Sequence, residues 1–264
     1  MYPELLRIGT FALNSYYVMA LLGFLIPMLI MRREFHREGI NPDLAVRIFV
    51  FAYIGGVVGS RVYYIIEHWD IFWQHPEMLI TNFTGLVWYG GLLGGALAVW
   101  LAIRRSSLPI WKAADHLGPM LLLGNSFGRL GCFLSGDGDY GPPSDVPWAM
   151  AFPDGLVPTN VPVHPTPLYD IALNLIFFSV LWNLRKRNYP NGTIFGMYLI
   201  AAGTERFITE FWRNTAKIAF GWVTMAQMIS LVLIISGIFL INRAANRGRE
   251  SRLVGAVPSL EKAQ

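Results

Sequence analysis

Long apolar stretches recur along the chain and are separated by short polar segments. Seven windows of near-constant length contain few charged residues: 15–31, 46–66, 86–103, 116–134, 168–184, 194–210 and 222–242. A helix needs about 20 residues to cross roughly 30 Å of hydrocarbon, and each window comes close to that length. The pattern predicts an all-α, polytopic membrane protein with about seven transmembrane helices. The sixth window is the least apolar of the set.

Composition supports a bilayer environment. Hydrophobic residues make up 54% of the chain and charged residues 14%, whereas soluble domains have about a quarter of their residues charged. The residues ahead of the first window are poor in basic charge, and no small-residue cleavage site follows it. We therefore expect the first helix to be retained and not removed as a signal peptide.

The basic residues gather in alternate connections between the windows. Fifteen of the 21 lysines and arginines fall on one side: Arg32, Arg33, Arg37, Arg47, Arg104, Arg105, Lys112, Arg185, Lys186, Arg187, Arg243, Arg247, Arg249, Arg252 and Lys262. Basic loops stay in the cytoplasm, so the N-terminus is predicted outside and the tail 243–264 inside. Because the net charge of +4 reflects this topology, no nucleic-acid partner is expected.

A long polar segment separates the fourth and fifth windows on the outer side. Residues 136–167 contain no lysine or arginine, four aspartates and eight of the sixteen prolines. Loops of this length without a function are uncommon, so we predict that the segment forms an outer-facing, loop-rich cap. The segment 67–74 is rich in tryptophan and phenylalanine, which favours a position along the membrane interface. With no internal repeat, residues 1–264 are expected to form a single integral-membrane domain.

Two apparent ligand motifs follow the fourth window, and we reject both. Residues 136–141 read G-x-G-x-x-G, but they follow an apolar helix instead of a strand, and their aspartates would repel a pyrophosphate. Read as a calcium loop from Asp137, the segment has Trp148 where a bidentate glutamate belongs. Cys132 is the only cysteine, and no histidine cluster accompanies it, so no metal and no cofactor are expected.

Four arginines lie within or at the outer ends of apolar windows: Arg61, Arg129, Arg206 and Arg213. A charge at the bilayer centre costs about 2.5 to 3.5 kcal/mol on insertion scales, which makes each a functional hypothesis. Arg206, Glu210 and Arg213 share one helix face. Arg61 follows the glycine-rich segment 55–59, and glycines let helices approach closely. If these faces converge, they would form a cationic pocket for a phosphate. Alternatively, each arginine pairs with a nearby acid, as Arg206 would with Glu210, or snorkels to the interface.

Four sequence motifs occur in order along the chain. They are Tyr89-Gly90-Gly91-Leu92, GRLGCFLSGDGDYG from Gly128 to Gly141, HPTPLY from His164 to Tyr169, and RFITEFWR from Arg206 to Arg213. Together they resemble bacterial prolipoprotein diacylglyceryl transferases, over a stretch from Gly9 to Ile241. The resemblance implies an enzyme of the bacterial inner membrane. It would move the diacylglyceryl group of phosphatidylglycerol onto the lipobox cysteine thiol of a prolipoprotein signal peptide and release glycerol 1-phosphate.

The resemblance also implies roles for individual residues. Arg129 and Arg206 match the family's arginines and would bind the phosphate. Glu210 would orient Arg206 or act as an acid/base group, and Tyr16 would donate a hydrogen bond to the lipid headgroup or anchor its helix at the interface. Gly141 is expected where a turn comes close to substrate. The candidate substrate-binding set also contains Arg61, Gly90, Gly91, Asp137, Cys132 and His164.

This chain departs from the family's pattern at four positions. Tyr89 stands where the best-known members have a histidine that is a candidate base, and a reference pKa of about 10 makes tyrosine a poor base at neutrality. Either Tyr89 only donates hydrogen bonds or the base lies elsewhere. Cys132 replaces a frequent asparagine, Asp137 a glutamate, and Ala202 a tyrosine. None of these changes removes a phosphate-binding charge.

Two residues of the set have alternative readings. Cys132, beside an arginine, could be a nucleophile of low pKa, but the substrate already supplies a thiol, which favours a packing role. His164 could act as an acid/base group or hold its loop by a hydrogen bond.

Two other functions were weighed against the transferase. A retinal protein would need a lysine in the last window, which has none. A transporter or binder of an anionic phosphorylated solute or lipid is the alternative, since arginines in a membrane cavity suit an anion. It would need a path open to the cytoplasm, whereas the candidate charges lie toward the outside, which favours the enzyme.

Overall fold

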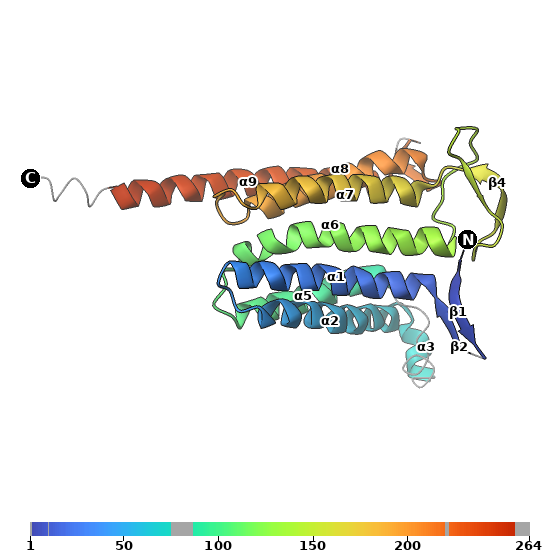
Figure 1. Cartoon of the computed structure of the whole chain (residues 1–264), viewed down its shortest axis with the longest axis horizontal. Helices are drawn as coiled ribbons and strands as arrows, with labels where there is room; N and C mark the ends of the chain where they lie inside the picture. The colour runs from blue at the N-terminus through green and yellow to red at the C-terminus, as the bar shows by residue number, and fades with distance from the viewer. Residues whose placement is uncertain (1, 10, 75–86, 220–221, 257–264) are drawn as a thin grey trace, which may run out of the picture. The chain divides into compact units, whose positions relative to one another are not determined.

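The chain is mainly helical in the computed structural model, which describes residues 2–9, 11–74, 87–219 and 222–256 (Figure 1). The helices are α1 Ser15–Arg37, α2 Asp43–Glu67, α3 Trp69–Gln74, α5 Trp88–Arg104, α6 Ile110–Ser135, α7 Thr166–Leu184, α8 Thr193–Thr209, α9 Met225–Ala256 and a 3-10 turn, Glu210–Trp212. Each predicted apolar window contains a helix over most of its length, although the window 222–242 begins with a turn and two strand residues before α9 starts. The aromatic segment that follows α2 contains α3.

Three short antiparallel strand pairs within the described segments modify the all-α prediction. Strand β1 (Glu4–Ile8) pairs with β2 (Phe11–Asn14), β3 (Met150–Phe152) with β4 (Thr159–Val163), and β5 (Lys217–Ala219) with β6 (Val223–Thr224). The second pair lies in the predicted cap, so the cap is a small folded layer and not only a loop. None of these strands exceeds five residues, too short for the period-two alternation that signals a strand.

Helix length and apolar composition indicate which helices could cross a membrane. Among the residues that the structure describes, four helices are long and apolar enough to cross a bilayer, namely α1, α2, α7 and the Met225–Gly248 part of α9, while α5 is apolar but shorter. Helix α6 carries Arg129, and the 17-residue α8 carries Glu205 and Arg206. Length and composition therefore do not establish seven spans.

The helix surfaces are typical of proteins that face lipid. Large apolar side chains such as Val58, Leu93 and Ile235 are exposed by more than half of their area. An aqueous surface seldom presents so much contiguous apolar area without a partner. These faces are therefore suited to contact acyl chains.

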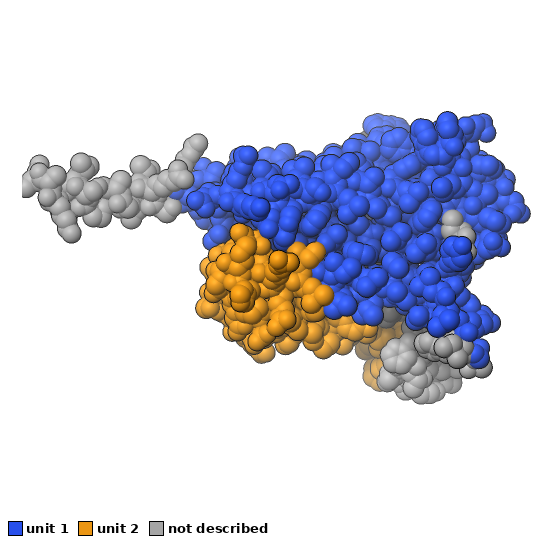
Figure 2. Space-filling view, in the orientation of Figure 1, with its two compact units in different colours: residues 1–27, 114–264 blue, residues 28–113 orange. Residues whose placement is uncertain are grey.

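Residue contacts divide the chain into two compact units, residues 1–27 with 114–264 and residues 28–113 (Figure 2). In the first unit, α8 packs against α7 and α9, and Leu122, Leu181 and Ala201 form a buried apolar cluster between α6, α7 and α8. The start of α1 lies against α6, where a side chain on Gly23 would meet the carbonyl oxygen of Gly124 at 3.0 Å.

One end of the first unit is basic and is held by a partly buried acid. Arg185, Lys186 and Arg187 follow α7 there. The carboxylate of Asp115 accepts hydrogen bonds from the backbone N–H groups of Gly192, at 2.7 Å, and Phe195, at 2.8 Å. It thereby caps the first turn of α8, whose N–H groups have no partner within the helix. The cap and the start of α7 belong to the opposite end of these helices.

The second unit depends on a glycine contact between α2 and α5. Gly55 and Gly59 of α2 face Gly90 and Gly94 of α5 so closely that an added Cβ on any of them would overlap backbone of the other helix. The expectation that the glycine-rich segment allows close helix approach is confirmed. Backbones at this separation gain van der Waals contact that larger residues would prevent.

We predict that Gly59→Ala destabilises the protein and Gly56→Ala does not. A Cβ at Gly59 would overlap the carbonyl oxygen of Gly90, whereas the nearest atom to a Cβ at Gly56 is 3.7 Å away. Overpacking of this kind costs about 1 to 3 kcal/mol, while both variants gain equally in helix propensity. Thermal unfolding in detergent measures the difference, and equal melting temperatures would refute the glycine contact.

Candidate functional site

A closed ring of ion pairs joins the cap to helices α6 and α7 in the first unit. Arg129 on α6 pairs with Asp139 through Nη1, and its Nε lies 3.1 Å from Oδ2 of Asp170 on α7. Arg213, just past the 3-10 turn, pairs with Asp139 through Nη2, and its Nη1 lies 3.2 Å from the same Oδ2 of Asp170. Two arginines and two aspartates therefore alternate around the ring.

The two aspartates of the ring differ in their environment. The side chain of Asp170 is fully buried, whereas that of Asp139 is 28% exposed. Arg213 is 9% exposed and Arg129 22%. Asp170 is thus the inner counter-ion, and a buried charge of this kind is very costly to leave unpaired.

Arg206 lies outside the ring of ion pairs, and one of its guanidinium nitrogens has no hydrogen-bond partner in the described part of the chain. Its Nη2 lies 2.8 Å from Oε2 of the buried Glu210, an ion pair whose angle is not that of a hydrogen bond. Glu210 also accepts a hydrogen bond from the hydroxyl of Thr215. Nη1 of Arg206 is buried and has no hydrogen-bond partner among the residues that the structure describes. Buried donors almost always have an acceptor, so a ligand atom is the expected partner here.

The charges around Arg206 are of both signs. Arg129 and Arg213 lie close enough to Arg206 for their positive charges to act on it, and so do the carboxylates of Glu210 and Asp170. These acids offset the arginine charges, so the unpartnered donor of Arg206, and not a surplus of positive charge, is the feature that a ligand would meet. An anion with several acceptor oxygens is the best-matched partner of a guanidinium.

A further carboxyl, Glu205, adjoins the ring and was missed by the sequence analysis. Its side chain is almost fully buried and directly precedes Arg206 on α8, and Asp170 and Arg129 lie close enough for their charges to act on it. Asp139 and Asp170 were missed too, although Asp170 and Glu205 are acids inside apolar windows, the signal that had singled out the arginines. Across the described ranges, no set of three or more metal-ligating side chains could hold a metal ion.

A tight turn after α6 carries Asp137 and brings Asp139 to the arginines. Gly136 and Gly138 have φ of +58° and +92°, a backbone region that favours glycine. Oδ1 of Asp137 accepts a hydrogen bond from the backbone N–H of Asp139 at 3.2 Å. Cys132, near the end of α6, lies close enough to Asp137 and Arg129 for their charges to act on its thiol, and its packing role stays a prediction.

Gly141 is buried where the chain approaches itself closely, and its expected approach to substrate stays a prediction. A Cβ at this position would overlap the carbonyl oxygen of Trp212 and lie 3.0 Å from Cβ of His164. Its N–H donates to the carbonyl oxygen of His164 at 2.8 Å. The close approach that requires glycine is therefore to the chain itself, where the cap meets the segment after α8.

His164 holds the cap by a hydrogen bond. Its Nδ1 lies 3.0 Å from the hydroxyl of Tyr169, and that hydroxyl accepts a hydrogen bond from Nε1 of Trp148 at 2.7 Å. The ring of Tyr169 also packs edge-on against Trp212. These contacts support the loop-holding reading of His164 over the acid/base one.

Tyr16 begins α1 beside the arginine-bearing helix. It is 42% exposed, and its ring approaches Gly131, where an added Cβ would lie 3.2 Å from Cδ2. Arg129 and Asp137 are near enough for their charges to act on its hydroxyl. The first unit thus brings Tyr16, Arg129, Asp137, Arg206 and Glu210 into one region.

The other predicted residues belong to the second unit. Arg61 lies over the ring of Tyr64, 5.3 Å from its centre. Gly90 and Gly91 lie at the start of α5, with Gly90 packed against Gly59, and Tyr89 is 52% exposed. Their convergence with Arg129 and Arg206 stays a prediction.

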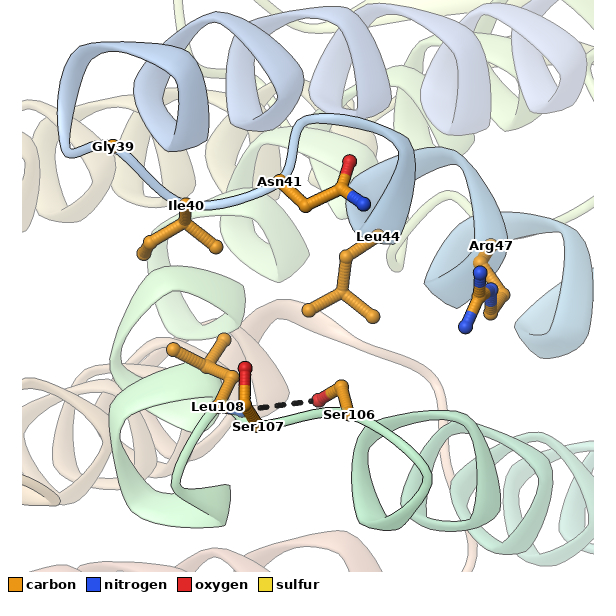
Figure 3. Close-up of a pocket in the computed structure, with 8 residues that line it drawn as sticks. All are labelled: Gly39, Ile40, Asn41, Leu44, Arg47, Ser106, Ser107 and Leu108. Atoms are coloured by element: carbon orange, nitrogen blue, oxygen red, sulfur yellow. Dashed lines mark hydrogen bonds between the residues drawn. The ribbon is translucent and has the colours of Figure 1, made fainter.

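A small pocket in the second unit offers no alternative site. It lies between the turns at 38–42 and 105–109 and is lined by Gly39, Ile40, Asn41, Leu44, Arg47, Ser106, Ser107 and Leu108 (Figure 3). The hydroxyl of Ser106 donates to the carbonyl of Ile103 at 2.7 Å and accepts from the N–H of Leu108 at 3.2 Å. Its polar capacity is used within its own turn, and none of the predicted site residues lines the pocket.

Comparison with known proteins gives a consistent result. The family model described as prolipoprotein diacylglyceryl transferase matches residues 3–243. A protein of Clostridium tetani is 32% identical over 92% of this chain and 97% of its own length, and one of Nitratidesulfovibrio vulgaris strain DP4 is 32% identical over 94% and 97%. A protein of Vibrio cholerae is 34% identical over 93% and 92%. All three carry the name phosphatidylglycerol–prolipoprotein diacylglyceryl transferase.

We predict that Glu210→Ala lowers stability far more than Glu4→Ala. Glu210 is the buried partner of Arg206, and removal of one member of a buried ion pair costs about 3 to 5 kcal/mol. Glu4 pairs with Arg7 on the exposed surface, where such pairs contribute little. Thermal unfolding in detergent compares the two, with Glu210→Gln expected between them. An equal, small effect of both alanine variants would show that Glu210 is not a structural counter-ion.

Proposed function

Because this chain belongs to the prolipoprotein diacylglyceryl transferase family, we propose that it transfers the diacylglyceryl group of phosphatidylglycerol to the lipobox cysteine of prolipoproteins. The protein is a membrane transferase. Its relatives' names supply the lipid donor and the protein acceptor. The lipobox cysteine within a signal peptide is the acceptor group we propose for this chain.

The reaction needs both a thiolate and a positive site for phosphate. The thiol sulfur attacks the glyceryl carbon, the carbon–sulfur bond forms, and the carbon–oxygen bond to phosphate breaks. The products are a thioether and glycerol 1-phosphate, and the thiol proton passes to a base. Since a free thiol has a pKa of about 8.5, little thiolate exists at neutrality without help. Charge on the departing phosphate is stabilised by fixed donors aimed at it.

The observation that carries the proposal is the unpartnered Nη1 of Arg206. It is buried beside Glu210, with the positive charges of Arg129 and Arg213 nearby. A phosphate oxygen of the lipid would accept its hydrogen bond and neutralise part of that charge. We therefore assign phosphate binding to Arg206 and Arg129.

Neighbouring side chains take supporting roles in this proposal. Glu210 orients Arg206, since one of its oxygens faces the guanidinium and the other accepts from Thr215. Tyr16 donates a hydrogen bond to the headgroup. Asp137 shapes the turn on which Asp139 lies, and Cys132 packs against it.

Residues of the second unit also have proposed roles toward the substrate. We propose that Arg61, Gly90 and Gly91 line the path of the lipid, and that Tyr89 donates a hydrogen bond to substrate while another group accepts the thiol proton. The exposure of Tyr89 and the close contact of Gly90 with Gly59 are compatible with these roles.

We further propose that residues 1–264 form a single integral-membrane domain of seven spans in the bacterial inner membrane. The N-terminus and cap would face outward and the tail 243–264 the cytoplasm, as the basic residues indicate. Phosphatidylglycerol would enter laterally from the bilayer, because each acyl CH₂ withdrawn into water costs about 0.8 kcal/mol.

The test is a mass shift on a defined peptide. Purified full-length protein in phosphatidylglycerol vesicles is incubated with a lipobox peptide, and with the same peptide carrying serine in place of cysteine. We expect a diacylglyceryl mass on the cysteine peptide alone. Arg129→Ala and Arg206→Ala should each reduce the rate by at least about a hundredfold, since loss of one donor to a developing charge has that effect.

An exposed aspartate of the cap, Asp145, provides the control, and Asp145→Asn should transfer at the normal rate. Absence of transfer by the folded, unaltered protein would refute the function. Full activity of the Arg129→Ala, Arg206→Ala double variant would refute the phosphate site while leaving the function standing.

A further inference from the structure

The two carboxylates of the ion-pair ring bind the same two arginines from different sides. Asp170 contacts Nε of Arg129 and Nη1 of Arg213, and it is fully buried. Asp139 contacts Nη1 of Arg129 and Nη2 of Arg213, and it is the most exposed member of the ring. Asp170 therefore holds the arginines from within, and Asp139 occupies the terminal nitrogens that a ligand from outside would reach.

Charge balance makes the two roles different when a phosphate arrives. Two arginines and two aspartates form a ring of zero net charge. A phosphate added beside the intact ring would place another negative charge against Asp139, and like charges at short range repel strongly in a poorly solvated site. If the carboxylate of Asp139 moves away from the arginines, the phosphate restores the charge balance. It then accepts hydrogen bonds from the two guanidinium groups that Asp139 released.

The local backbone would allow Asp139 to leave without unfolding the turn. The N–H of Asp139 donates to Oδ1 of Asp137 at 3.2 Å, and its carbonyl oxygen accepts a hydrogen bond from Thr166 Oγ1 at 2.5 Å. These backbone bonds do not involve the carboxylate. A rotation of the side chain toward solvent is therefore enough to release both arginines.

We propose that the carboxylate of Asp139 occupies the phosphate position on Arg129 and Arg213 until the substrate phosphate displaces it. This competition sets the affinity of the site for phosphate. The proposal rests on the proposed function, because it needs these arginines to bind a phosphate. It adds Arg213 to the phosphate site and makes Asp139 a specificity-determining residue: only an anion that outcompetes a tethered carboxylate can enter. The exchanged ligand is a phosphate group, either of the lipid or of the released glycerol 1-phosphate.

The experiment compares Asp139→Asn with Asp170→Asn, which each remove one negative charge from the same pair of arginines. The KM for phosphatidylglycerol in vesicles and the inhibition constant of glycerol 1-phosphate are measured for both variants, with Asp145→Asn as the control. Asp139→Asn should lower one or both constants by about three- to tenfold, because the phosphate no longer displaces a charged hydrogen bond. Asp170→Asn should raise them, because the arginines lose the partner that fixes them.

The direction in which the KM and the inhibition constant change distinguishes displacement of Asp139 by phosphate from a purely structural role of Asp139. A structural role predicts that both variants weaken phosphate binding, so a rise or no change in both constants with Asp139→Asn overturns the proposal. A fall in the KM identifies the lipid phosphate as the displaced ligand, and a fall in the inhibition constant alone identifies the product phosphate. Asp139→Ser repeats the test with a smaller side chain, and the melting temperature of each variant shows that it is folded.

The failure of the proposed function would look different. In that case glycerol 1-phosphate would not inhibit the unaltered protein, and no lipid would be transferred in any sample. If the unaltered protein is active and inhibited, and Asp139→Asn leaves both constants unchanged, only the exchange is wrong.

Discussion

Buried charge that must be neutralised is the constraint on which the rest of this structure depends. Arginine side chains in a bilayer protein are tolerated only with partners, because the low dielectric removes the solvation that would otherwise stabilise them. The chain meets this requirement with a ring in which Arg129 and Arg213 share Asp139 and Asp170, and with the separate pair Arg206 and Glu210. Each acid comes from a different part of the sequence, so the ring also fixes how the cap and helices meet.

The fold can be understood as a support for that ring. Glycines at 136 and 138 let the chain turn sharply after α6 and place Asp139 over the arginines. Gly141 allows the cap to contact the backbone of Trp212, and Tyr169 ties His164 to Trp148. The arginines are thereby held before any ligand arrives, and pre-organised donors of this kind stabilise developing charge without reorganisation during the reaction. Arg206 remains the one guanidinium of the three with a buried, unpartnered nitrogen in the described part of the chain.

The helices were predictable from sequence because apolar windows of bilayer length have few other solutions. The candidate arginines were predictable for the same reason, since a charge among apolar residues is conspicuous. The strand pairs were not, because two to five residues are too few to show a period. The partners Asp139, Asp170 and Glu205 were missed because pairing depends on distances between segments 10 to 74 residues apart, which no local pattern encodes. The close contact of Gly141 with the backbone of Trp212, far along the chain, was not predictable for the same reason, and the expected approach of its turn to substrate stays a prediction.

The central claim is that Arg206 and its neighbouring arginines bind the phosphate of the lipid substrate. The most direct test is an experimental structure of the full-length protein in phosphatidylglycerol-containing lipid, determined with an unreactive analogue of the acceptor peptide. The account predicts a phosphate oxygen about 3 Å from Nη1 of Arg206, with Arg129 contacting the same phosphate. A headgroup bound elsewhere, with Nη1 of Arg206 satisfied by a protein acceptor, would contradict it.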